Sequence, residues 1–461
     1  MNSTTLANAF NKDLVRKYNR PGPRYTSYPT APHFRKGLDP KPLLRALNDE
    51  NSRNRPISLY LHLPFCESNC WFCGCTKIIT SDHSRADGYL DYLEKEIELL
   101  KGHLDMQREV VQLHLGGGTP TFFSAEQFRR LDKILKSNFR FAADSENGVE
   151  IDPRRLKQEQ IATLAEMGFN RASLGVQDNN PEVQEAIHRI QPREMTEQTL
   201  EWLRAAGFQS VNIDLIYGLP LQTVDSFERT VNEVLALRPD RFALFSYAHV
   251  PWIKPTQKIF DVRKVLPDDE TKLSILERAS SQLIEAGYAY IGMDHFALES
   301  DALVEAQQKG ELQRNFQGYS TRGGVDICAL GMSSISQTYG SYRQNEKDLK
   351  DYMRRIDAGE LPISGGYLLT ADDQIRRETI MRLMCDLQLD FVQLSERLNI
   401  NFCDYFTDAL AALQPMADDG LVDIFEDRLE VTPSGRFLLR NLAMPFDAYL
   451  EQQAARYSKT V

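Results

Sequence analysis

Residues 60–75 read YLHLPFCESNCWFCGC and contain four cysteines, Cys66, Cys70, Cys73 and Cys75. The cysteine thiolate is a soft ligand, and three of them at intervals of four and three residues can bind one iron-sulfur cluster within a compact loop. Zinc fits less well, because a structural zinc site takes further ligands from a distant segment and no second Cys or His pair follows. Buried or disulfide-bonded cysteines are also disfavoured, since the rest of this long chain is poor in cysteine. The motif therefore predicts an iron-sulfur cluster.

The pattern Cys66-x-x-x-Cys70-x-Phe72-Cys73 resembles the cluster motif of radical S-adenosylmethionine (SAM) enzymes. In that superfamily three cysteines bind a 4Fe-4S cluster and the fourth iron stays open. The amino and carboxylate groups of SAM bind the open iron, and SAM is split to a 5'-deoxyadenosyl radical. The resemblance thus implies a 4Fe-4S cluster and SAM as cofactors.

Two features narrow the resemblance to one family. Cys75 follows in Cys73-Gly74-Cys75, and residues 22–30 read GPRYTSYPT. Both are similar to oxygen-independent coproporphyrinogen III oxidases, in a resemblance that covers nearly the whole chain. Such an enzyme oxidatively decarboxylates two propionates of coproporphyrinogen III to vinyl groups, giving protoporphyrinogen IX in haem biosynthesis. The resemblance implies a radical SAM oxidoreductase with this activity.

The resemblance also implies site residues. Cys66, Cys70 and Cys73 match the cluster ligands, and Cys75 matches a residue that the family requires without its binding the cluster, so we assign it a catalytic part. The positions that match SAM contacts are Tyr60, Phe72, Gly117, Gly118, Thr119, Glu150, Gln177, Arg189, Asp214, Ala248, Phe316, Gln317 and Ile335. Phe316, Gln317 and Ile335 match positions around a second SAM molecule.

Six apolar runs separated by helical patterns predict an α/β fold. They are residues 58–63, 110–115, 148–152, 171–176, 211–217 and 241–247. Continuous apolar runs suit parallel strands that are covered on both faces. Ser124-x-x-Gln127, Asp152-Pro153 and Asn180-Pro181 are typical of helix starts. We therefore predict a partial (β/α)6 radical SAM barrel, and the changed pattern after residue 247 counts against a closed eight-unit barrel.

Several candidate site residues fall at the ends of these runs, where α/β barrels carry their chemistry. The glycines from Gly116 to Gly118 follow the second run, and their missing side chains let the backbone approach a ligand closely. Glu150 ends the third run and can accept hydrogen bonds from a ribose or an amino group. Asp214 can act as an acceptor and Arg189 as a donor or carboxylate partner.

The chain divides into four predicted segments. They are an N-terminal basic arm (1–50), the partial barrel (51–250), a barrel extension with active-site loops (251–364) and a C-terminal domain (365–461). In the last segment Thr370-x-x-Asp373 predicts a first helix, and two more helices precede a hairpin and a final helix. We predict a small, mostly helical, winged-helix-like domain. Its acidic character disfavours DNA binding and favours a cover for the barrel mouth.

The N-terminal arm is basic in a chain whose net charge is -11. From Lys12 to Lys36 seven Lys and Arg residues accompany one acid, Asp13, together with three tyrosines. Such an arm suits either a solvated tail or a grip on a flat polyanion. Because residues 22–30 resemble the oxidase family, we expect the arm to close over the substrate's macrocycle.

Composition bounds the partners and the compartment. No window reaches the roughly 18 consecutive apolar residues of a membrane span, and the N-terminus lacks the apolar core of a secretory signal. The net charge disfavours nonspecific nucleic-acid binding. We predict a cytoplasmic monomer without membrane or nucleic-acid partners. The resemblance implies coproporphyrinogen III as substrate and an electron donor such as flavodoxin or ferredoxin.

Other functions stay open at this point. A haem-binding chaperone of the same radical SAM fold is the main alternative, although such relatives lack counterparts of Cys75 and of the PRYTSYPT stretch. A DNA-binding iron-sulfur sensor and a methyltransferase of the superfamily are further alternatives. The chain also departs from the family pattern at Trp71, Asn179 and His188, where Tyr, Phe and Asn are expected. None of these departures removes a predicted ligand.

Overall fold

The computed structural model describes residues 9–450 and Tyr457. The start of the predicted arm, residues 1–8, and part of the predicted C-terminal segment, residues 451–456 and 458–461, lie outside the described residues.

The chain forms two compact units, each built from segments that are distant in the sequence. The strand unit comprises His33–Leu215 and Gly324–Leu368, and the terminal unit comprises Met1–Pro32, Ile216–Gly323 and Leu369–Val461. The four predicted segments divide the chain along its sequence instead, and that division stays a prediction.

The strand unit is built on one row of strands in the order β1-β17-β16-β15-β14-β2-β5-β6-β7-β8. Their bounds are β1 (Arg35–Lys36), β2 (Ile57–Leu63), β5 (Glu109–Gly117), β6 (Arg140–Ile151), β7 (Arg171–Gln177), β8 (Ser210–Tyr217), β14 (Asp326–Leu330), β15 (Ile335–Gln337), β16 (Ser341–Asn345) and β17 (Ile363–Leu368). From β14 through β2, β5, β6 and β7 to β8 the neighbours pair in parallel. From β14 to β1 they pair antiparallel.

Five of the six predicted strands form the parallel part of this row, so the predicted α/β class is confirmed. Their apolar runs are covered on both faces, as in β2, where every residue except Tyr60 is buried. The row is open and is not a closed barrel. The sixth predicted strand, β9 (Arg241–Ser246), belongs to the terminal unit.

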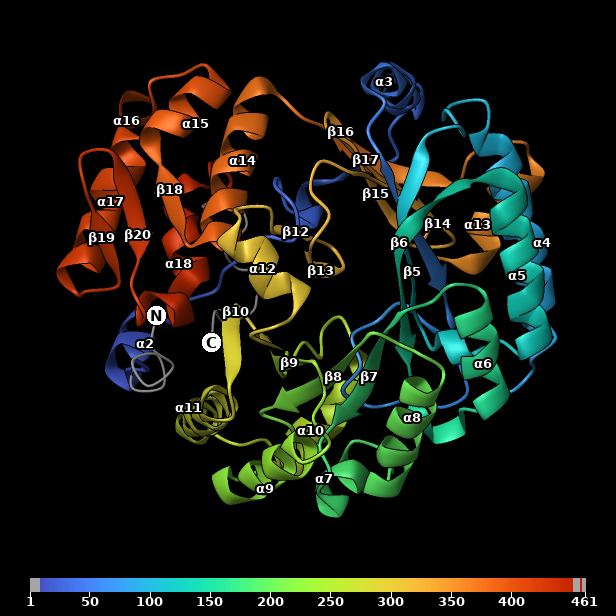
Figure 1. The fold of residues 1–461 in the computed structure, drawn as a ribbon, viewed down its shortest axis with the longest axis horizontal. Coiled ribbons are helices and arrows are strands. Elements are labelled where there is room, and N and C mark those ends of the chain that lie inside the picture. The colour runs from blue at the N-terminus through green and yellow to red at the C-terminus, as the bar shows by residue number, and fades with distance from the viewer. Residues whose placement is uncertain (1–8, 451–456, 458–461) are drawn as a thin grey trace. The chain divides into compact units, whose positions relative to one another are not determined.

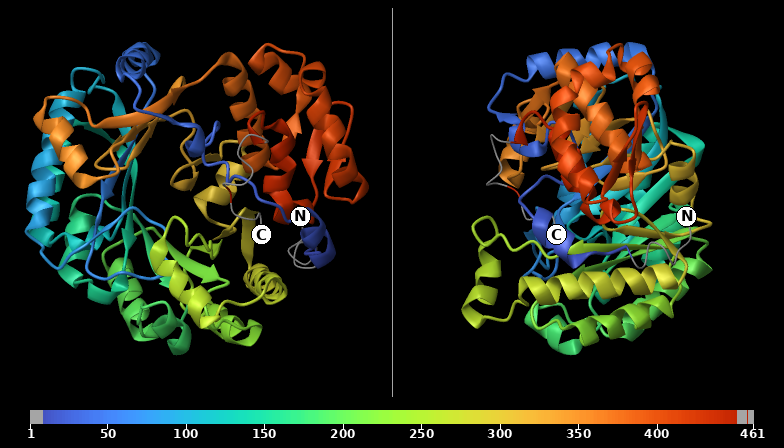
Figure 2. Two further views of the ribbon diagram at one scale, coloured as in Figure 1. Left: turned by 180° about the vertical axis from the view of Figure 1, so that it is seen from behind. Right: turned by 90° about the vertical axis from the view of Figure 1, so that its left-hand side faces the viewer.

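Helices connect the parallel strands from β2 to β8. Their bounds are α4 (Arg85–Leu100), α5 (Ala125–Asn138), α6 (Gln158–Glu166), α7 (Pro181–Ala186) and α8 (Arg193–Ala205). Two further helices of the unit are α3 (Lys41–Glu50), which precedes β2, and α13 (Leu349–Asp357), which joins the antiparallel strands β16 and β17. Figure 1 shows α4, α5 and α6 along the outer side of β5 and β6, and Figure 2 shows the same helices from behind. Their apolar sides bury residues such as Leu93 and Ile97 of α4 and Phe128 and Leu131 of α5.

Two of the three helix starts predicted in this unit begin an α-helix. Ser124 forms a capping box with Gln127 at the start of α5, and Asn180 accepts from the Glu182 N–H at the start of α7. Asp152 also caps, but the element that follows is the 3-10 turn η4 (Pro153–Arg155) and not an α-helix.

The terminal unit contains helices and short strands that pair with one another antiparallel. Its helices are α2 (Lys12–Tyr18), α9 (Val224–Leu235), α10 (Lys258–Arg263), α11 (Asp269–Glu285), α12 (Ala302–Gln308), α14 (Ala371–Asp386), α15 (Phe391–Leu398), α16 (Phe402–Tyr405), α17 (Thr407–Asp418) and α18 (Leu439–Ala443). Its strands are β9, β10 (Tyr288–Gly292), β11 (His295–Leu298), β12 (Gln313–Asn315), β13 (Gly318–Ser320), β18 (Gln388–Asp390), β19 (Val422–Ile424) and β20 (Arg428–Val431). They pair as β9-β11-β10, β12-β13 and β18-β20-β19.

The C-terminal part is mostly helical, as predicted. The capping box of Thr370 and Asp373 starts α14, and α15 is the predicted second helix. The predicted third helix is divided into α16 and α17, because the chain leaves the α conformation near Phe406. β19 and β20 form the predicted hairpin, and β18 is a third strand that the sequence analysis missed.

The described part of the N-terminal arm is not a solvated tail. Val15, Tyr25 and Tyr28 are buried in one apolar core with residues of α14, α15, α17 and α18. The Tyr25 hydroxyl donates to the Asp447 carboxylate at 3.0 Å, and the Tyr28 hydroxyl accepts from the Ala448 N–H at 3.0 Å. Long-range packing therefore fixes the two tyrosines.

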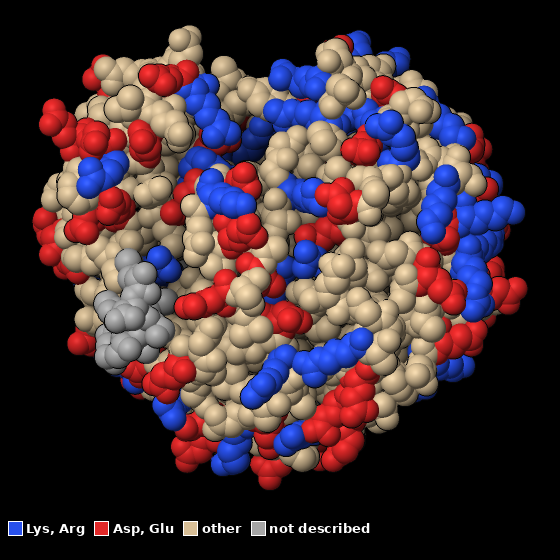
Figure 3. All heavy atoms as spheres, viewed as in Figure 1, with Lys and Arg blue, Asp and Glu red and all other residues tan. Residues whose placement is uncertain are grey.

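Two observations concern the surface. None of the described helices is long and apolar enough to cross a membrane. On the face shown in Figure 3, acidic and basic side chains are interspersed, with no single sign of charge covering the face.

A buried carboxylate on α4 fixes a loop of the strand unit. Glu96 is 2% exposed, and its oxygens accept from the Gly331 N–H at 2.8 Å, the Tyr352 hydroxyl at 2.7 Å and the Asn345 amide at 2.6 Å. Burial raises the pKa of Glu96 to about 7. The carboxylate holds the turn between β14 and β15, which precedes the predicted site residue Ile335.

We expect this group to make stability depend on pH. Because the pKa of Glu96 is higher in the folded than in the unfolded chain, its contribution is present below about pH 4.5 and is lost as the pH rises through about 7. The loss should reach about 3 kcal/mol. In urea unfolding from pH 5 to pH 8, the stability difference between the native protein and Glu96→Gln should therefore shrink as the pH rises. A difference that does not vary with pH would contradict this.

Candidate active site

The cysteine motif lies in a loop that is closed at both ends. It runs between β3 (Phe65–Cys66), which follows β2, and β4 (Ile78–Ile79), and the two short strands pair in parallel. The Ile78 N–H donates to the Pro64 carbonyl at 2.7 Å, and the Thr80 N–H donates to the Cys66 carbonyl at 2.9 Å. The loop therefore begins and ends at the carboxyl end of β2.

The backbone after β5 holds the other side of the same segment. The Gly118 N–H donates to the Leu63 carbonyl at 2.9 Å, and the Thr119 N–H donates to the Phe65 carbonyl at 2.9 Å. A Cβ on Gly118 would lie 2.6 Å from the carbonyl carbon of Pro64. The missing side chain thus permits a close approach between two protein backbones, and the predicted contact of Gly118 with SAM stays a prediction.

The four cysteines of the motif differ in exposure. Cys66 and Cys70 are buried, Cys73 is half-buried and Cys75 is exposed. The Thr119 hydroxyl donates to the Cys66 sulfur at 3.3 Å, while burial raises the pKa of the Cys66 thiol to about 11. The hydrogen bond between Cys75 and Cys73 lowers the pKa of Cys73 to about 5 and raises that of Cys75. Cys73 therefore has the strongest thiolate character of these three.

Two arginines donate to the Cys70 sulfur. The distances are 3.3 Å from Arg154 Nη2 and 3.6 Å from Arg189 Nη1. Asp152 accepts from both guanidinium groups, at 2.6 Å from Arg154 and 2.9 Å from Arg189. Burial raises the pKa of Asp152, but the two cations outweigh it and hold that pKa well below its ordinary value. Asp152 and Arg154 were not predicted as site residues, although Asp152 is the last residue of the third apolar run and Arg154 follows two residues later.

These donors fit an iron-sulfur cluster. Within residues 9–450 and Tyr457, no group of three Cys, His, Asp or Glu side chains is arranged for a single metal ion. A four-iron cluster takes each thiolate on a different iron, so the sulfurs need not converge on one point. Thiols from one loop, with O–H and N–H donors to the sulfurs of Cys66, Cys70 and Cys73, have the donor chemistry and outer contacts of such a site.

A row of rings lies beside the loop. The Tyr60 hydroxyl donates to His62 Nδ1 at 3.2 Å, and His62 Nε2 donates to the Thr76 carbonyl within the cysteine loop at 2.9 Å. The Tyr60 ring stacks on His114, with ring centroids 5.9 Å apart. Tyr60 was predicted, whereas the two histidines were missed because neither has a motif around it.

Glu150 lies close to the glycine run. Its Oε2 accepts from the Gly117 N–H at 3.2 Å, and its Oε1 lies 3.4 Å from His114 Nε2. A Cβ on Gly116 would come within 2.8 Å of Oε1. Nearly half of the Glu150 side-chain surface is exposed, at 46%. The carboxylate is thus oriented by the protein and still open to a ligand.

Asp214 lies within β8 as a second acid of this region. It accepts from the Ser173 hydroxyl at 3.1 Å and from the Asn212 amide at 2.7 Å. Burial and the charge of Glu150 raise the pKa of Asp214 to about 7. Asp214 therefore changes its protonation near neutral pH.

Gln177 ends β7 in a strained conformation. Its φ is +72°, which is unusual for a side chain other than glycine. The residue is 8% exposed, and its Oε1 has no hydrogen-bond partner among the described residues. Gly175, two residues earlier, accepts from Arg189 Nη2 through its carbonyl at 2.6 Å. A buried acceptor held unused in strained backbone indicates a ligand-binding position.

The other predicted SAM positions are divided between the units. Phe72 is half-buried within the cysteine loop, and Ile335 is the first residue of β15, both in the strand unit. Phe316 and Gln317 form the tip of the β12–β13 hairpin, and Ala248 is exposed after β9, all in the terminal unit.

Two of the departures from the family pattern contact each other. The rings of Trp71 and His188 stack at 5.3 Å with an interplanar angle of 8°. The Trp71 N–H donates to the Ile187 carbonyl at 3.0 Å, and His188 Nδ1 lies 3.0 Å from the Asn69 carbonyl. The two changes thus form one contact between the cysteine loop and the segment before Arg189.

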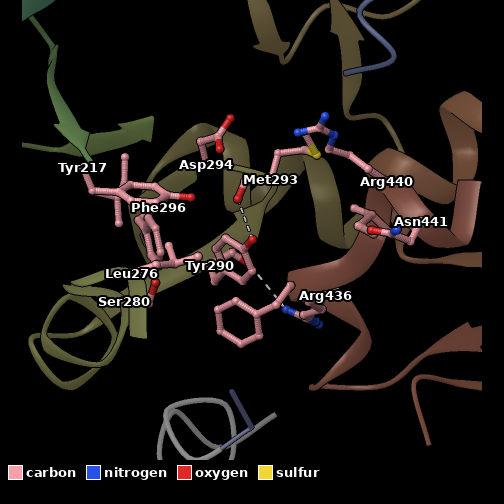
Figure 4. Close-up of a pocket in the computed structure, with 13 residues that line it drawn as sticks. Tyr217, Leu276, Ser280, Tyr290, Met293, Asp294, Phe296, Arg436, Arg440 and Asn441 are labelled. Atoms are coloured by element: carbon pink, nitrogen blue, oxygen red, sulfur yellow. Dashed lines mark hydrogen bonds between the residues drawn. The ribbon is translucent and has the colours of Figure 1, made fainter. Parts of the chain in front are cut away.

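Two pockets, one in each unit, differ in volume. One of about 400 Å³ opens beside the cysteine loop and is lined by Cys66, Thr119, Asp152 and Arg154 among others. A second pocket, in the terminal unit, holds only about 30 Å³ (Figure 4). That volume suits a water molecule or one small polar group and not a tetrapyrrole.

Comparison with known proteins decides the family. The model of the radical SAM superfamily matches residues 60–234, and that of the HemN C-terminal domain matches residues 369–438. The oxygen-independent coproporphyrinogen III oxidase of Pseudomonas aeruginosa is 45% identical over 456 residues, covering 97% of this chain and 98% of the relative. The chain belongs to the oxygen-independent coproporphyrinogen III oxidase family.

Other members of the family agree over the same length. The Escherichia coli oxidase is 46% identical over 442 residues, which cover 96% of each chain. The solved structure described as coproporphyrinogen III oxidase (HemN) from Escherichia coli, a radical SAM enzyme, superposes with a TM-score of 0.89 and covers 96% of this chain and 99% of that one. The predicted fold, with a radical SAM domain and a helical C-terminal domain, is thereby confirmed.

The contact of Gly118 with Pro64 should be essential in this family member. In Gly118→Ala the new Cβ meets backbone atoms at 2.6 Å, so the strand end must move and the cysteine loop with it. We expect the variant, after anaerobic reconstitution, to retain less than half of the native iron and to unfold at lower temperature. Gly74→Ala is the matched control, because a Cβ there meets nothing within 4 Å. Equal iron content in both variants would contradict the role of Gly118.

Proposed function

We propose that this protein catalyses the oxygen-independent oxidative decarboxylation of two propionate side chains of coproporphyrinogen III, giving the vinyl groups of protoporphyrinogen IX. The observation that carries the proposal is the closed cysteine loop at the carboxyl end of β2, in a chain 45% identical to a named oxidase over 97% of its length. The protein is a radical SAM oxidoreductase with a 4Fe-4S cluster and SAM as cofactors.

Cys66, Cys70 and Cys73 hold the cluster in this proposal. With SAM bound, such a cluster would supply the 5'-deoxyadenosyl radical chemistry that the oxidation of each propionate requires. Thr119 keeps a hydroxyl donor on the Cys66 sulfur, and Arg154 keeps a cationic donor on Cys70. Such donors orient the thiolates and stabilise negative charge on them.

Four polar residues of the strand unit are suited to hold SAM. Glu150 and Asp214 are acceptors for its amino or hydroxyl groups, and the unused Oε1 of Gln177 is a third acceptor. Arg189 is the carboxylate partner, since its Nε has no partner among the described residues. We propose Tyr60, Phe72, Ala248 and the backbone from Gly117 to Thr119 as further contacts. Phe316, Gln317 and Ile335 are proposed for a second SAM.

Cys75 is proposed as a catalytic residue outside the cluster. Its backbone N–H donates to the Cys73 sulfur at 3.4 Å, while its own thiol is exposed. The short distance in sequence makes it a poor ligand for the same cluster. A protonated thiol in this position can serve in proton or electron transfer to the substrate.

The partners and the compartment are part of the same proposal. A small one-electron protein such as flavodoxin or ferredoxin reduces the cluster, and the protein works as a monomer. It acts in the cytoplasm, where thiolates stay reduced and available as ligands.

The direct test is anaerobic turnover of the reconstituted protein with dithionite, SAM and coproporphyrinogen III. We expect 5'-deoxyadenosine and protoporphyrinogen IX to form together. Cys66→Ser should lose both products, and Cys403→Ser, an exposed cysteine outside the motif, should keep both. Tight haem binding without a vinyl product would contradict the proposal and favour the haem-binding chaperone.

A separate variant tests the proposed catalytic role of Cys75. Cys75→Ser should keep the native iron content and form 5'-deoxyadenosine, but its yield of vinyl product should fall by at least tenfold. Full yield of protoporphyrinogen IX in this variant would contradict a catalytic part for Cys75.

The pKa of Asp214 predicts pH-dependent binding of SAM. Above about pH 7 the carboxylate is ionised and accepts hydrogen bonds, and below that pH its protonation removes an acceptor. SAM should therefore bind roughly tenfold more weakly at pH 6 than at pH 8. Equilibrium dialysis under nitrogen measures this, and Asp214→Asn should show the weaker affinity at both pH values. A native affinity that is constant over this range would overturn the assignment.

A further inference from the structure

Two arginines of the terminal unit donate to residues 22–24 of the N-terminal arm, and this short segment carries a third, Arg24. Arg440 donates to the carbonyls of Gly22 at 2.6 Å and Pro23 at 3.2 Å. Arg314 Nε donates to the carbonyl of Arg24 at 3.4 Å. Residues from the arm, from β12 and from α18 thus bring three guanidinium groups together, although they are far apart in the sequence.

The positive charge of this group exceeds its negative charge. Asp294 is the carboxylate paired with Arg24, and no other described carboxylate forms an ion pair with Arg24 or Arg314. Loss of solvent and the charges of Arg440 and Arg314 lower the pKa of Arg24 to about 9, so it stays protonated at neutral pH. Charges in a protein interior are normally paired, because an unpaired one is costly to desolvate.

Arg314 has an unused donor. The residue is 3% exposed, and its Nη1 has no hydrogen-bond partner among the described residues. Its guanidinium lies 4.7 Å from the centre of the Tyr319 ring, and this contact leaves Nη1 without an acceptor. A guanidinium group offers planar paired donors that match a carboxylate. Arg314 Nη1 can therefore donate to an anionic ligand, because no described protein group accepts from it.

A small pocket adjoins this group at Asp294 and Arg440. The pocket of about 30 Å³ in Figure 4 is bordered by Asp294 and Arg440 and by the aromatic rings of Tyr217, Tyr290 and Phe296. In this view Asp294 and the Arg440 guanidinium lie at the same edge of the pocket. Arg24 keeps 33% of its side-chain surface exposed, so a ligand from solution can reach it.

We infer that Arg314, Arg24 and Arg440 form a carboxylate-binding site for one propionate of the tetrapyrrole substrate. The inference rests on the proposed function for the identity of the ligand. The carboxylate of the bound propionate neutralises the excess positive charge of the arginines. Arg314 is the specificity-determining residue, because its free donor recognises a carboxylate and rejects an uncharged side chain.

Binding of coproporphyrin III, the oxidised and unreactive form of the substrate, tests the site on the full reconstituted chain. Fluorescence quenching under nitrogen measures the Kd for the native protein and for Arg314→Met. Loss of a hydrogen bond to a charged group should weaken binding about tenfold to hundredfold. Arg314→Lys, which keeps the charge without the paired donors, should lie between the two.

Controls separate this effect from loss of structure. Arg382→Met removes another buried arginine of the terminal unit, one that already pairs with Asp386 at 3.0 Å, and should leave the Kd unchanged. SAM cleavage without substrate and iron content should be native in Arg314→Met. The tetramethyl ester of coproporphyrin III should bind the native protein and Arg314→Met equally, because it has no carboxylate for Arg314 to recognise.

The possible results separate a failure of the carboxylate site from a failure of the proposed decarboxylation activity. If Arg314→Met weakens the acid and its ester alike, or binds the acid with native affinity, the carboxylate site is wrong. If inorganic phosphate raises the melting temperature through Arg314 while porphyrin binding does not depend on Arg314, the site is one for free anions and the inference fails. If coproporphyrin III binds through Arg314 but no vinyl product forms from the reduced substrate, the proposed function fails and the carboxylate site stands.

Discussion

Residues 63–66 accept backbone hydrogen bonds from two neighbouring segments, and these bonds determine the geometry of the cysteine loop. The Ile78 and Thr80 amides hold one side of this segment, and the Gly118 and Thr119 amides hold the other. A loop with three cysteines is flexible by itself, so its ligands would lose much entropy on ordering. Here β2 and β5 order the ends of the loop in advance, and the thiols begin from a rigid base.

The charged side chains beside the cysteine loop are paired with one another. Asp152 follows β6 and neutralises Arg154 and Arg189, which both donate to the Cys70 sulfur. Donors of this kind stabilise electron density on a ligating sulfur and so affect the ease with which a cluster accepts an electron. The terminal unit differs, because Asp294 pairs with Arg24 and no described carboxylate pairs with Arg314. The arginines beside the cysteine loop are thus paired within the protein, whereas Arg314 has no described carboxylate partner.

Local sequence signals were sufficient for much of the fold. The apolar runs of β2, β5, β7 and β8 and the capping boxes of α5 and α14 depend on residues that are close in the chain. β14 was missed, because its five buried residues are too few for a periodic pattern and its place beside β2 depends on long-range pairing. The burial of Tyr25 and Tyr28 was missed for the same reason, since helices from the other end of the chain cover them.

Site residues were predictable where a motif carries them and not elsewhere. The cysteines and the glycine run are recognisable in one stretch of sequence, whereas Arg154 and His62 act through single contacts that only the folded chain creates. The sequence also gave no signal for the strained backbone of Gln177, because its φ of +72° depends on the irregular pairing of β7 with β8. Motifs therefore located the chemistry, and tertiary contacts supplied its environment.

The central claim is that three cysteines on this clamped loop leave one iron of the cluster open for SAM. Electron-nuclear double resonance of the reduced, reconstituted protein, with SAM labelled with nitrogen-15 in its amino group, tests it most directly. The account predicts a nitrogen-15 coupling to the cluster in the native protein and in Cys403→Ser. An intact reduced cluster without that coupling, at saturating SAM, would contradict the account.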